Sequence, residues 1–330
     1  MTHSATSTLR FLATVQDAGA SGTEVAAGRI LEWIDRAGYV CAVGWSGTYC
    51  VTAYVGNLHV VETIQPGELV EIDSRIIHTG RTSMQVLVEV RSSGIPEQAF
   101  TTAMNCILVF VAVDQEGRPT PVRQWSPTLP IEKVLQRGAL ARVVVRQQIR
   151  RAMEAEAYSE MGTTPRVVLQ FLALPSAVNF GGKVHGGSVL RWINEAAYAC
   201  AASWTSTAAR AVYSGGIHFH QPIQIGQLVE IDARLIYLEG ARMHISIEVR
   251  SKDLTSQVAT RTTQCMSIFV DPDETGVLRQ PRTFALQSAE DRRLARHAEY
   301  LIQLRSQLDD VPRGTRIDEA AASQASDARR

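Results

Sequence analysis

Two stretches of the chain carry apolar residues at helical spacing, and each begins close to glycine. The apolar positions are Ile30, Leu31, Ile34, Ala37 and Val40 in the first stretch, and Val189, Leu190, Ile193, Ala196 and Ala197 in the second. This spacing places the apolar side chains on one face of an α-helix. Few charged residues interrupt either stretch, so we expect other structure to wrap each helix.

The segments around these helices show the patterns of β-strands. Leu69 to Ile77 and Met84 to Arg91 alternate apolar and polar residues, as half-buried strands do. Met104 to Val113 is a nearly continuous apolar run, which predicts a central strand. Short strands are expected before the two helices, over Phe11 to Val15 and Val167 to Ala173. One long helix against a curved antiparallel sheet is an α+β unit.

The two helical stretches belong to an internal repeat. With Ala26 set against His185, an offset of 159 residues, AAGRILEWIDRAGYVCAVGW lies over HGGSVLRWINEAAYACAASW. Further on, GELVEIDSRII matches GQLVEIDARLI at the same offset. Chance does not keep one offset over so long a span. The sequence therefore predicts two tandem copies of one α+β unit.

The repeat divides the chain of 330 residues into four segments. They are 9–123 for the first copy, 124–165 for a linker with a long helix, 166–284 for the second copy and 285–330 for a C-terminal helix and tail. Helical patterns cover Ile131 to Met161 in the linker and Ser288 to Leu308 after the second copy. From Asp309 the chain is polar and alanine-rich without an apolar period, which predicts disorder.

The composition narrows the possible partners and compartments. The 33 basic and 33 acidic residues balance, so no overall field attracts nucleic acid or anionic lipid. The N-terminal stretch MTHSATSTLRF has no apolar core long enough for a signal peptide. No run approaches the roughly 20 apolar residues of a membrane span. We therefore expect a cytoplasmic protein that binds neither nucleic acid nor membrane.

The cysteines give no sign of a metal site. They are Cys41, Cys50, Cys106, Cys200 and Cys265. None forms a C-x-x-C pair or the Cys–His spacing of a zinc site, so no metal is expected. Apolar neighbours surround most of them, which predicts buried free thiols.

The second helical stretch begins with an unusually open loop. Gly181, Gly182, Gly186 and Gly187 leave backbone N–H groups without side chains around them. A helix N-terminus with exposed N–H groups is suited to bind an anion or a polarised carbonyl. This is the chemistry that the sequence offers most clearly.

The residues of this loop and helix resemble those of a known family. The pattern N-x5-H-G-G-x6-[DN], formed by Asn179, His185, Gly186, Gly187 and Asn194, resembles acyl-CoA thioesterases of the hotdog fold. GRTSMQVLVEV in the first copy is similar to the family's glycine-arginine-serine strand motif, and the duplication resembles the double-hotdog acyl-CoA hydrolases. The resemblance implies that the two sheets join, the two helices lie antiparallel, and each active site is shared between the copies.

The resemblance implies two composite sites, and the sequence distinguishes them. One combines Asn179, His185, Gly186 and Gly187 of the second copy with Asp35 of the first. The other combines Ala20, Ala26 and Ala27 of the first copy with Asn194 of the second. An amide is neither a base at neutral pH nor a carboxylate nucleophile. We predict one working site per chain, and it needs both copies.

Roles at the intact site follow from thioester chemistry. N–H groups around Gly186 and Gly187 would polarise the carbonyl. Asp35 would act as general base or as nucleophile, a choice that the sequence leaves open. Asn179 would aim the water or the carbonyl, although a turn-forming or capping residue fits there too. For His185, holding the loop is favoured over direct catalysis.

Further candidates come from the resemblance alone. Thr52 begins the strand after the first helix and would touch the catalytic water, although strand propensity explains it equally well. Arg81, Thr82 and Ser83 would hold the coenzyme A part of the substrate, unless they form only an exposed strand end. Strand alternation, and not the resemblance, places His218 and His220 on one strand face. No third metal ligand lies near them in the sequence, so packing is favoured over a metal site.

The sequence therefore predicts an acyl-CoA thioesterase of lipid or fatty acid metabolism that needs no cofactor. Two alternatives stay open: an enoyl-CoA hydratase or dehydratase on the same fold, and a non-catalytic acyl-CoA-binding protein. The resemblance also implies a homo-oligomer, commonly a trimer of double hotdogs.

Overall fold

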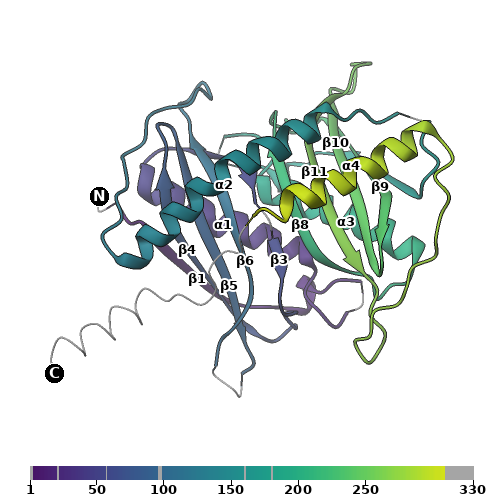
Figure 1. The fold of residues 1–330 in the computed structure, drawn as a ribbon. Helices are drawn as coiled ribbons and strands as arrows, with labels where there is room; N and C mark the ends of the chain where they lie inside the picture. The colour runs from purple at the N-terminus through teal and green to yellow at the C-terminus, as the bar shows by residue number, and fades with distance from the viewer. Residues whose placement is uncertain are drawn as a thin grey trace.

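The two copies share one continuous antiparallel sheet in the computed structural model (Figure 1), which describes residues 3–20, 22–56, 58–95, 99–159, 161–179 and 181–308. The strands of the first copy are β1 (Thr6–Leu12), β2 (Cys50–Val55), β3 (Leu58–Val60), β4 (Leu69–Thr79), β5 (Ser83–Ser93) and β6 (Thr101–Ala112). Those of the second are β7 (Arg166–Leu172), β8 (Arg210–Phe219), β9 (Leu228–Glu239), β10 (Arg242–Lys252) and β11 (Thr260–Val270). Their order across the sheet is β1-β4-β5-β6-β2-β8-β11-β10-β9-β7, with β3 beside β6 and β8.

In the described ranges, four α-helices cover this sheet on its two faces. They are α1 (Ala27–Ser46), α2 (Pro130–Ala155), α3 (Gly186–Trp204) and α4 (Ala289–Arg305). In Figure 1, α2 and α4 cross in front of the sheet, and α1 and α3 lie behind it. Short 3-10 helices, η1 (Val15–Asp17) and η2 (Pro175–Ala177), precede α1 and α3.

Strands that are buried on both faces explain the dense apolar runs of the sequence. On β5, Val86, Val88 and Val90 belong to the main core, which includes the apolar faces of α1 and α3. Leu87, which points the other way, packs in a separate cluster with Leu135 of α2. The two central helices are therefore enclosed, as their scarcity of charge predicts.

The two copies join where β2 pairs with β8. Tyr54 lies opposite His218, and Val55 lies opposite Ile217. Behind this junction α1 and α3 run antiparallel, with the first turn of each against the second turn of the other. A Cβ built at Gly28 would lie 3.0 Å from the carbonyl oxygen of Arg191, and one at Gly187 would lie 3.0 Å from the Cα of Glu32. Glycine at these two positions permits the close approach of the helices.

Several expected boundaries need correction. The first strand was expected over Phe11 to Val15, but β1 runs from Thr6 to Leu12, where each residue pairs with β4. Val15 instead starts η1, because Asp17 caps the backbone N–H of Thr14 at 2.8 Å and turns the chain. The linker helix was expected to reach Met161 but ends at Ala155.

The early end of α2 has a packing reason. Glu156 leaves the helix with extended backbone, and Tyr158 becomes buried with its hydroxyl against that of Ser246 on β10. α4 matches the expected helix to within three residues at its C-terminal end. The tail expected from Asp309 lies outside the described residues. All five cysteines are buried and free, as the sequence predicts.

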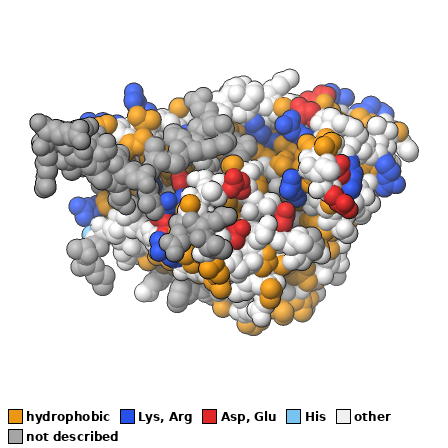
Figure 2. Space-filling view, turned by 90° about the horizontal axis from the view of Figure 1, so that it is seen from below, with side chains coloured by type: hydrophobic (Ala, Val, Ile, Leu, Met, Phe, Trp, Pro, Cys, Tyr) orange, Lys and Arg blue, Asp and Glu red, His pale blue; other side chains and the backbone are white. Residues whose placement is uncertain are grey.

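The surface of the described residues is mixed in charge. Figure 2 shows acidic and basic side chains interspersed on one face, without a broad patch of a single sign. Within the described ranges, no helix is long and apolar enough to cross a membrane. In the same part of the chain, no group of three or more His, Cys, Asp or Glu side chains is arranged to hold a metal ion.

Candidate functional site

The loop before α3 is shaped by its own backbone and by Asn179. The Asn179 side-chain oxygen accepts hydrogen bonds from the backbone N–H groups of Gly181 at 2.9 Å and Lys183 at 3.1 Å. Gly182 takes a positive φ of 73°, a conformation that glycine adopts without strain. The loop then delivers His185 to the N-cap of α3. Asn179 therefore acts at least as the turn-forming residue of this loop.

The carboxylate of Asp35 meets the start of α3 across the junction between the copies. Asp35 lies in the third turn of α1 and is only 1% exposed. Its Oδ1 accepts a hydrogen bond from the hydroxyl of Thr52 on β2 at 2.7 Å. Its Oδ2 accepts one from the backbone N–H of Gly187 at 2.7 Å. A buried carboxylate needs such donors, and α3 supplies one together with its positive dipole end.

His185 completes this contact. Its Nδ1 lies 3.0 Å from Asp35 Oδ2 and 3.0 Å from the backbone nitrogen of Gly187. Because the Gly187 N–H has the nearer acceptor in Asp35, a proton on Nδ1 donated to Asp35 satisfies all three groups. Burial lowers the pKa of His185, but the hydrogen bond and the charge of Asp35 outweigh it, so this pKa is raised above its usual value.

Gly186 lies directly against the carboxylate. A Cβ at this position would be 2.9 Å from the Thr52 hydroxyl and 3.1 and 3.2 Å from the Asp35 oxygens. Any side chain here would displace the acceptor. The backbone N–H of Gly186 is at the first position of α3, where helices leave donors unpaired. In the described part of the chain it has no hydrogen-bond partner, so it is the free donor beside Asp35.

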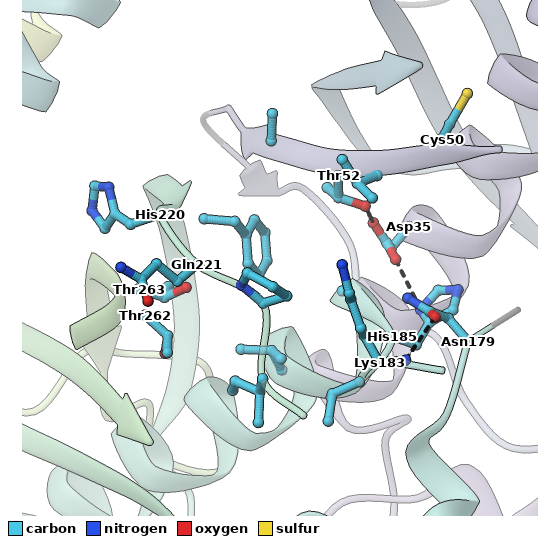
Figure 3. Close-up of a pocket in the computed structure, with 18 of the residues that line it drawn as sticks. Asp35, Cys50, Thr52, Asn179, Lys183, His185, His220, Gln221, Thr262 and Thr263 are labelled. Carbon is cyan, nitrogen blue, oxygen red and sulfur yellow. Dashed lines mark hydrogen bonds and ion pairs between the residues drawn. The ribbon is translucent and has the colours of Figure 1, made fainter. Parts of the chain in front are cut away.

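A pocket of about 230 Å³ opens beside these groups and is lined by both copies. Asp35, Thr52, His185 and Asn179 lie on one side in Figure 3, and polar side chains of β11 and of the loop after β8 lie opposite. These opposing residues are His220, Gln221, Thr262 and Thr263. Lys183 projects into the space between the two sides.

The structure brings together most of the candidates but separates one group. Arg81 and Thr82 lie in the turn between β4 and β5, and Ser83 begins β5; none of the three lines the pocket, and Arg81 is exposed. The carbonyl of Thr82 accepts from the backbone N–H of Ala112 at 3.0 Å, next to the pocket residue Val113. The three residues therefore lie outside the cavity, near its rim.

Sequence reasoning missed several lining residues. Tyr39, Cys50, Lys183, His220, Gln221 and Thr263 were not proposed for the site. Of these residues, only Lys183 could have been proposed from the sequence, because it lies between Gly182 and Gly186 in the glycine-rich loop. His220 was assigned to packing together with His218, and their rings do stack with centroids 6.4 Å apart. His220 also lines the pocket, because β8 ends there.

The other composite position lacks the contacts seen around Asp35. Asn194 is 7% exposed, and its amide nitrogen has no hydrogen-bond partner within the described ranges. At the repeat offset, Ala26 replaces His185 and Ala211 replaces Thr52. The expected match of Asn179 with Ala20 is wrong by one residue. Gly22 donates to the carbonyl of Gly19 as Gly182 donates to that of Asn179, so Gly19 is the counterpart.

Comparison with known proteins agrees with this duplicated architecture. Residues 25–99 and residues 181–257 each match the model of the thioesterase superfamily. A protein of Buchnera aphidicola named an uncharacterized acyl-CoA thioester hydrolase is 30% identical over 121 residues, which cover 36% of this chain and 89% of that protein. The cytosolic acyl coenzyme A thioester hydrolase of Homo sapiens is 24% identical over 289 residues, which cover 79% of this chain and 73% of that protein.

A solved structure shows the same fold. An acyl-ACP thioesterase from Bacteroides thetaiotaomicron covers 80% of this chain and 97% of its own, with a TM-score of 0.53 and 10% identity. The aligned part of the chain spans only 60% of the length of two curated relatives from Helicobacter pylori, and 38% of the length of a third from Mus musculus. The expected α+β fold of two tandem hotdogs is confirmed. With a family match in each copy, and 30% identity over most of the Buchnera protein, the chain belongs to the thioesterase superfamily.

Proposed function

We propose that the protein hydrolyses acyl-CoA thioesters to a carboxylic acid and coenzyme A at one composite site per chain. The observation that carries the proposal is the buried carboxylate of Asp35, held by the N-terminus of α3 beside a pocket that both copies line. The names of the relatives, acyl-CoA thioester hydrolases from a bacterium and from Homo sapiens, support the same reaction.

The free donor at Gly186 suits the thioester carbonyl. Gly187 already donates to Asp35, so Gly186 is the N–H group left to stabilise the oxyanion that develops during attack. The dipole of α3 adds positive potential at the same point. Loss of one such donor typically costs about 10²–10³ in rate. The sequence predicted that the N–H groups of both Gly186 and Gly187 polarise the carbonyl. We now propose this role for the N–H group of Gly186 alone.

Asp35 is the carboxylate available for the chemical step. It acts either as a general base toward water or as a nucleophile. In the second case a mixed anhydride forms as the C–S bond breaks and the coenzyme A thiolate leaves, and water then hydrolyses the anhydride to restore the carboxylate. Thr52 and His185 hold its two oxygens, so both side chains would orient the reacting group. The carbonyl of the Asn179 side chain is used by the loop, which leaves its NH₂ group to aim water or substrate.

Contact with the rest of coenzyme A is proposed for the rim. Thr82, the middle residue of Arg81, Thr82 and Ser83, accepts a hydrogen bond from Ala112, which is one residue from the pocket-lining Val113. A bound thioester extends out of a cavity of about 230 Å³, because coenzyme A is much larger than that space. The turn between β4 and β5 is then a surface along which the cofactor portion of the substrate would run.

The direct test is a panel of acyl-CoA thioesters assayed with a thiol reagent that reports free coenzyme A. We expect turnover by the wild-type protein and its loss in Asp35→Asn, with a smaller loss in Asn179→Ala. Unchanged rates in Asp35→Asn would overturn the proposed site. Tight acyl-CoA binding without any release of thiol would instead support a non-catalytic binding protein.

One observation favours a second candidate. Hotdog hydratases are expected to need an Asp/His pair, and the structure places His185 Nδ1 3.0 Å from Asp35 across the junction. Crotonyl-CoA is the test substrate, and the fall in its enoyl absorbance measures hydration. A fall without release of thiol would assign the Asp35–His185 pair to hydration. Thiol release without hydration assigns it to hydrolysis.

Compartment and assembly complete the proposal. A cytoplasmic site of action agrees with the name of the relative from Homo sapiens, which is called cytosolic. A homo-oligomer, such as a trimer of double hotdogs, is expected from the resemblance. Light scattering on the purified protein gives the number of chains directly.

A further inference from the structure

The pocket contains one strong cation that the mechanism does not use. Lys183 is the single Lys or Arg side chain among the described residues that line it. It belongs to the loop before α3, two residues from His185. Figure 3 shows its ammonium group directed into the cavity, between Asp35 and the polar wall formed by His220 and Gln221.

The backbone of Lys183 is fixed, but its side chain crosses to the other copy. Its N–H donates to the Asn179 side chain at 3.1 Å, and its carbonyl accepts from the Asn179 N–H at 2.7 Å. Its Nζ lies 3.7 Å from the position that a Cβ would take at Gly117. Gly117 belongs to the exposed turn after β6, and it also lines the pocket. The side chain of Lys183 therefore reaches from the loop of the second copy to the turn of the first, across the opening of the cavity.

No carboxylate of the described residues neutralises this ammonium. Asp35 is engaged by Thr52, Gly187 and His185, and none of its contacts involves Lys183. The acidic side chains of the turn around Gly117 form ion pairs with an arginine instead: Arg118 lies 2.9 Å from Asp114 and 2.8 Å from Glu116. A cation that is partly withdrawn from water and has no counter-charge is suited to an anion that enters with the substrate.

We propose that Lys183 binds an anionic oxygen of the substrate at the pocket mouth and thereby selects charged thioesters. The proposal rests on the proposed thioesterase function. Two parts of a substrate carry such oxygens: the phosphate groups of coenzyme A, and a carboxylate at the far end of a dicarboxylic acyl group. The position of Nζ beside an exposed turn, at the rim, gives both groups access to it.

Three substrates separate these sources when they are assayed with Lys183→Met, which removes the charge and keeps the chain length. Butanoyl-CoA carries phosphates alone, succinyl-CoA carries phosphates and a carboxylate, and the butanoyl thioester of N-acetylcysteamine carries neither. If phosphate is the ligand, KM rises about tenfold or more for both CoA thioesters and stays unchanged for the truncated one. If the acyl carboxylate is the ligand, only succinyl-CoA is affected.

Two further variants serve as controls. Lys183→Arg keeps the charge and is expected to recover most of the lost affinity. Lys133→Met removes a charge from the exposed surface of α2 and should leave all three substrates unchanged. An equal loss on all three substrates in Lys183→Met would indicate a disturbed loop, and no loss on any would show that Lys183 meets no anion; either result overturns the proposal.

Chemical labelling of Lys183 tests the anion site without measuring turnover, so it separates the anion site from the proposed thioesterase activity. The chain has only three lysines, Lys133, Lys183 and Lys252, so acetylation by an amine reagent is easily mapped by mass spectrometry. Coenzyme A or succinate should protect Lys183 and leave Lys133 and Lys252 exposed to the reagent. Protection without turnover of any thioester would leave the anion site standing while the thioesterase proposal fails. Absence of protection by both ligands would refute the anion site even in an active enzyme.

Discussion

The backbone N–H of Gly187 donates a hydrogen bond of 2.7 Å to the carboxylate of Asp35, which lies 152 residues earlier in the chain. This one contact ties the N-terminus of α3 in the second copy to the middle of α1 in the first. The carboxylate of Asp35 has no counterpart in the second copy, where Asn194 takes the equivalent position, and His185 has none in the first, where Ala26 does. The candidate site therefore exists only because the two sheets join through β2 and β8.

Removal of the carboxylate should abolish the chemistry. We expect Asp35→Asn to lower kcat by about 10³-fold, within the range of general-base contributions. Thr52→Val should lower it by about ten- to a hundredfold, because a hydrogen bond to a charged group is lost. Steady-state kinetics with a saturating acyl-CoA measures both effects. Equal activity of Thr52→Val and wild type would assign Thr52 to strand structure alone.

The glycine at position 186 is expected to be required for activity more than for stability. In Gly186→Ala the new methyl group would lie 2.9 Å from the Thr52 hydroxyl and 3.1 Å from an Asp35 oxygen, so these groups must shift. A misplacement of about 1 Å at reacting groups costs on the order of 10²-fold in rate, so we expect the smaller shift here to lower kcat by up to about that factor. Kinetics and thermal unfolding of the same sample separate the two effects.

Gly44→Ala is the matched control for this change. Gly44 lies in α1 on the exposed side, and a Cβ there meets nothing within 4 Å. Alanine in a helix interior is expected to raise stability by about 0.5–1 kcal/mol and to leave the rate unchanged. If both alanine variants lose activity alike, the contact at Asp35 is not the cause.

We expect that one substitution does not make the second composite position, at Asn194, active. Asn194→Asp in the Asp35→Asn background supplies a carboxylate to the other half of the duplicated pair. Ala26 and Ala211 still replace the His185 and Thr52 partners, so we expect less than about 1% of wild-type turnover. A thiol-release assay with excess protein detects such residual rates. Recovery of substantial activity would show that the chain keeps two functional sites.

Much of this architecture was accessible from the sequence because the repeat is well preserved. Trp33 and Trp192, or Cys41 and Cys200, keep the offset through both central helices, and glycines at Gly28 and Gly187 keep the helix crossing. The pairing of Asp35 with the start of α3 followed from the resemblance to double hotdogs. The structure then supplied distances that no pattern contains.

Other features depended on contacts that a one-dimensional pattern does not encode. The free donor at Gly186 appears only when Gly187 is seen to donate to Asp35. The pocket role of His220 follows from the point where β8 ends, and not from its alternation with His218. The single-residue difference between the two loops, which pairs Asn179 with Gly19, is visible only in the hydrogen bonds.

Three buried histidines between the sheet and helices α2 and α4 should make the free energy of unfolding depend on pH. Burial lowers the pKa of His218 to about 3, and of His244 and His297 to about 4; nearby arginines add to each shift. The unfolded chain, in which these side chains titrate near 6.5, therefore binds protons first as pH falls. The stability that the neutral histidines provide is present above pH 6.5 and is lost as pH drops toward 4.

At pH 5 each of these buried histidines should cost about 2 kcal/mol relative to pH 7.5, as an upper estimate. Urea unfolding at the two pH values measures the sum. His297→Leu removes one titrating group from the face of α4 that packs on the sheet, so the difference between the two pH values should shrink by about a third. His185 acts in the opposite sense, since its pKa is raised and its contribution fades as pH rises. Identical pH dependence in wild type and His297→Leu would show that His297 does not titrate in this way.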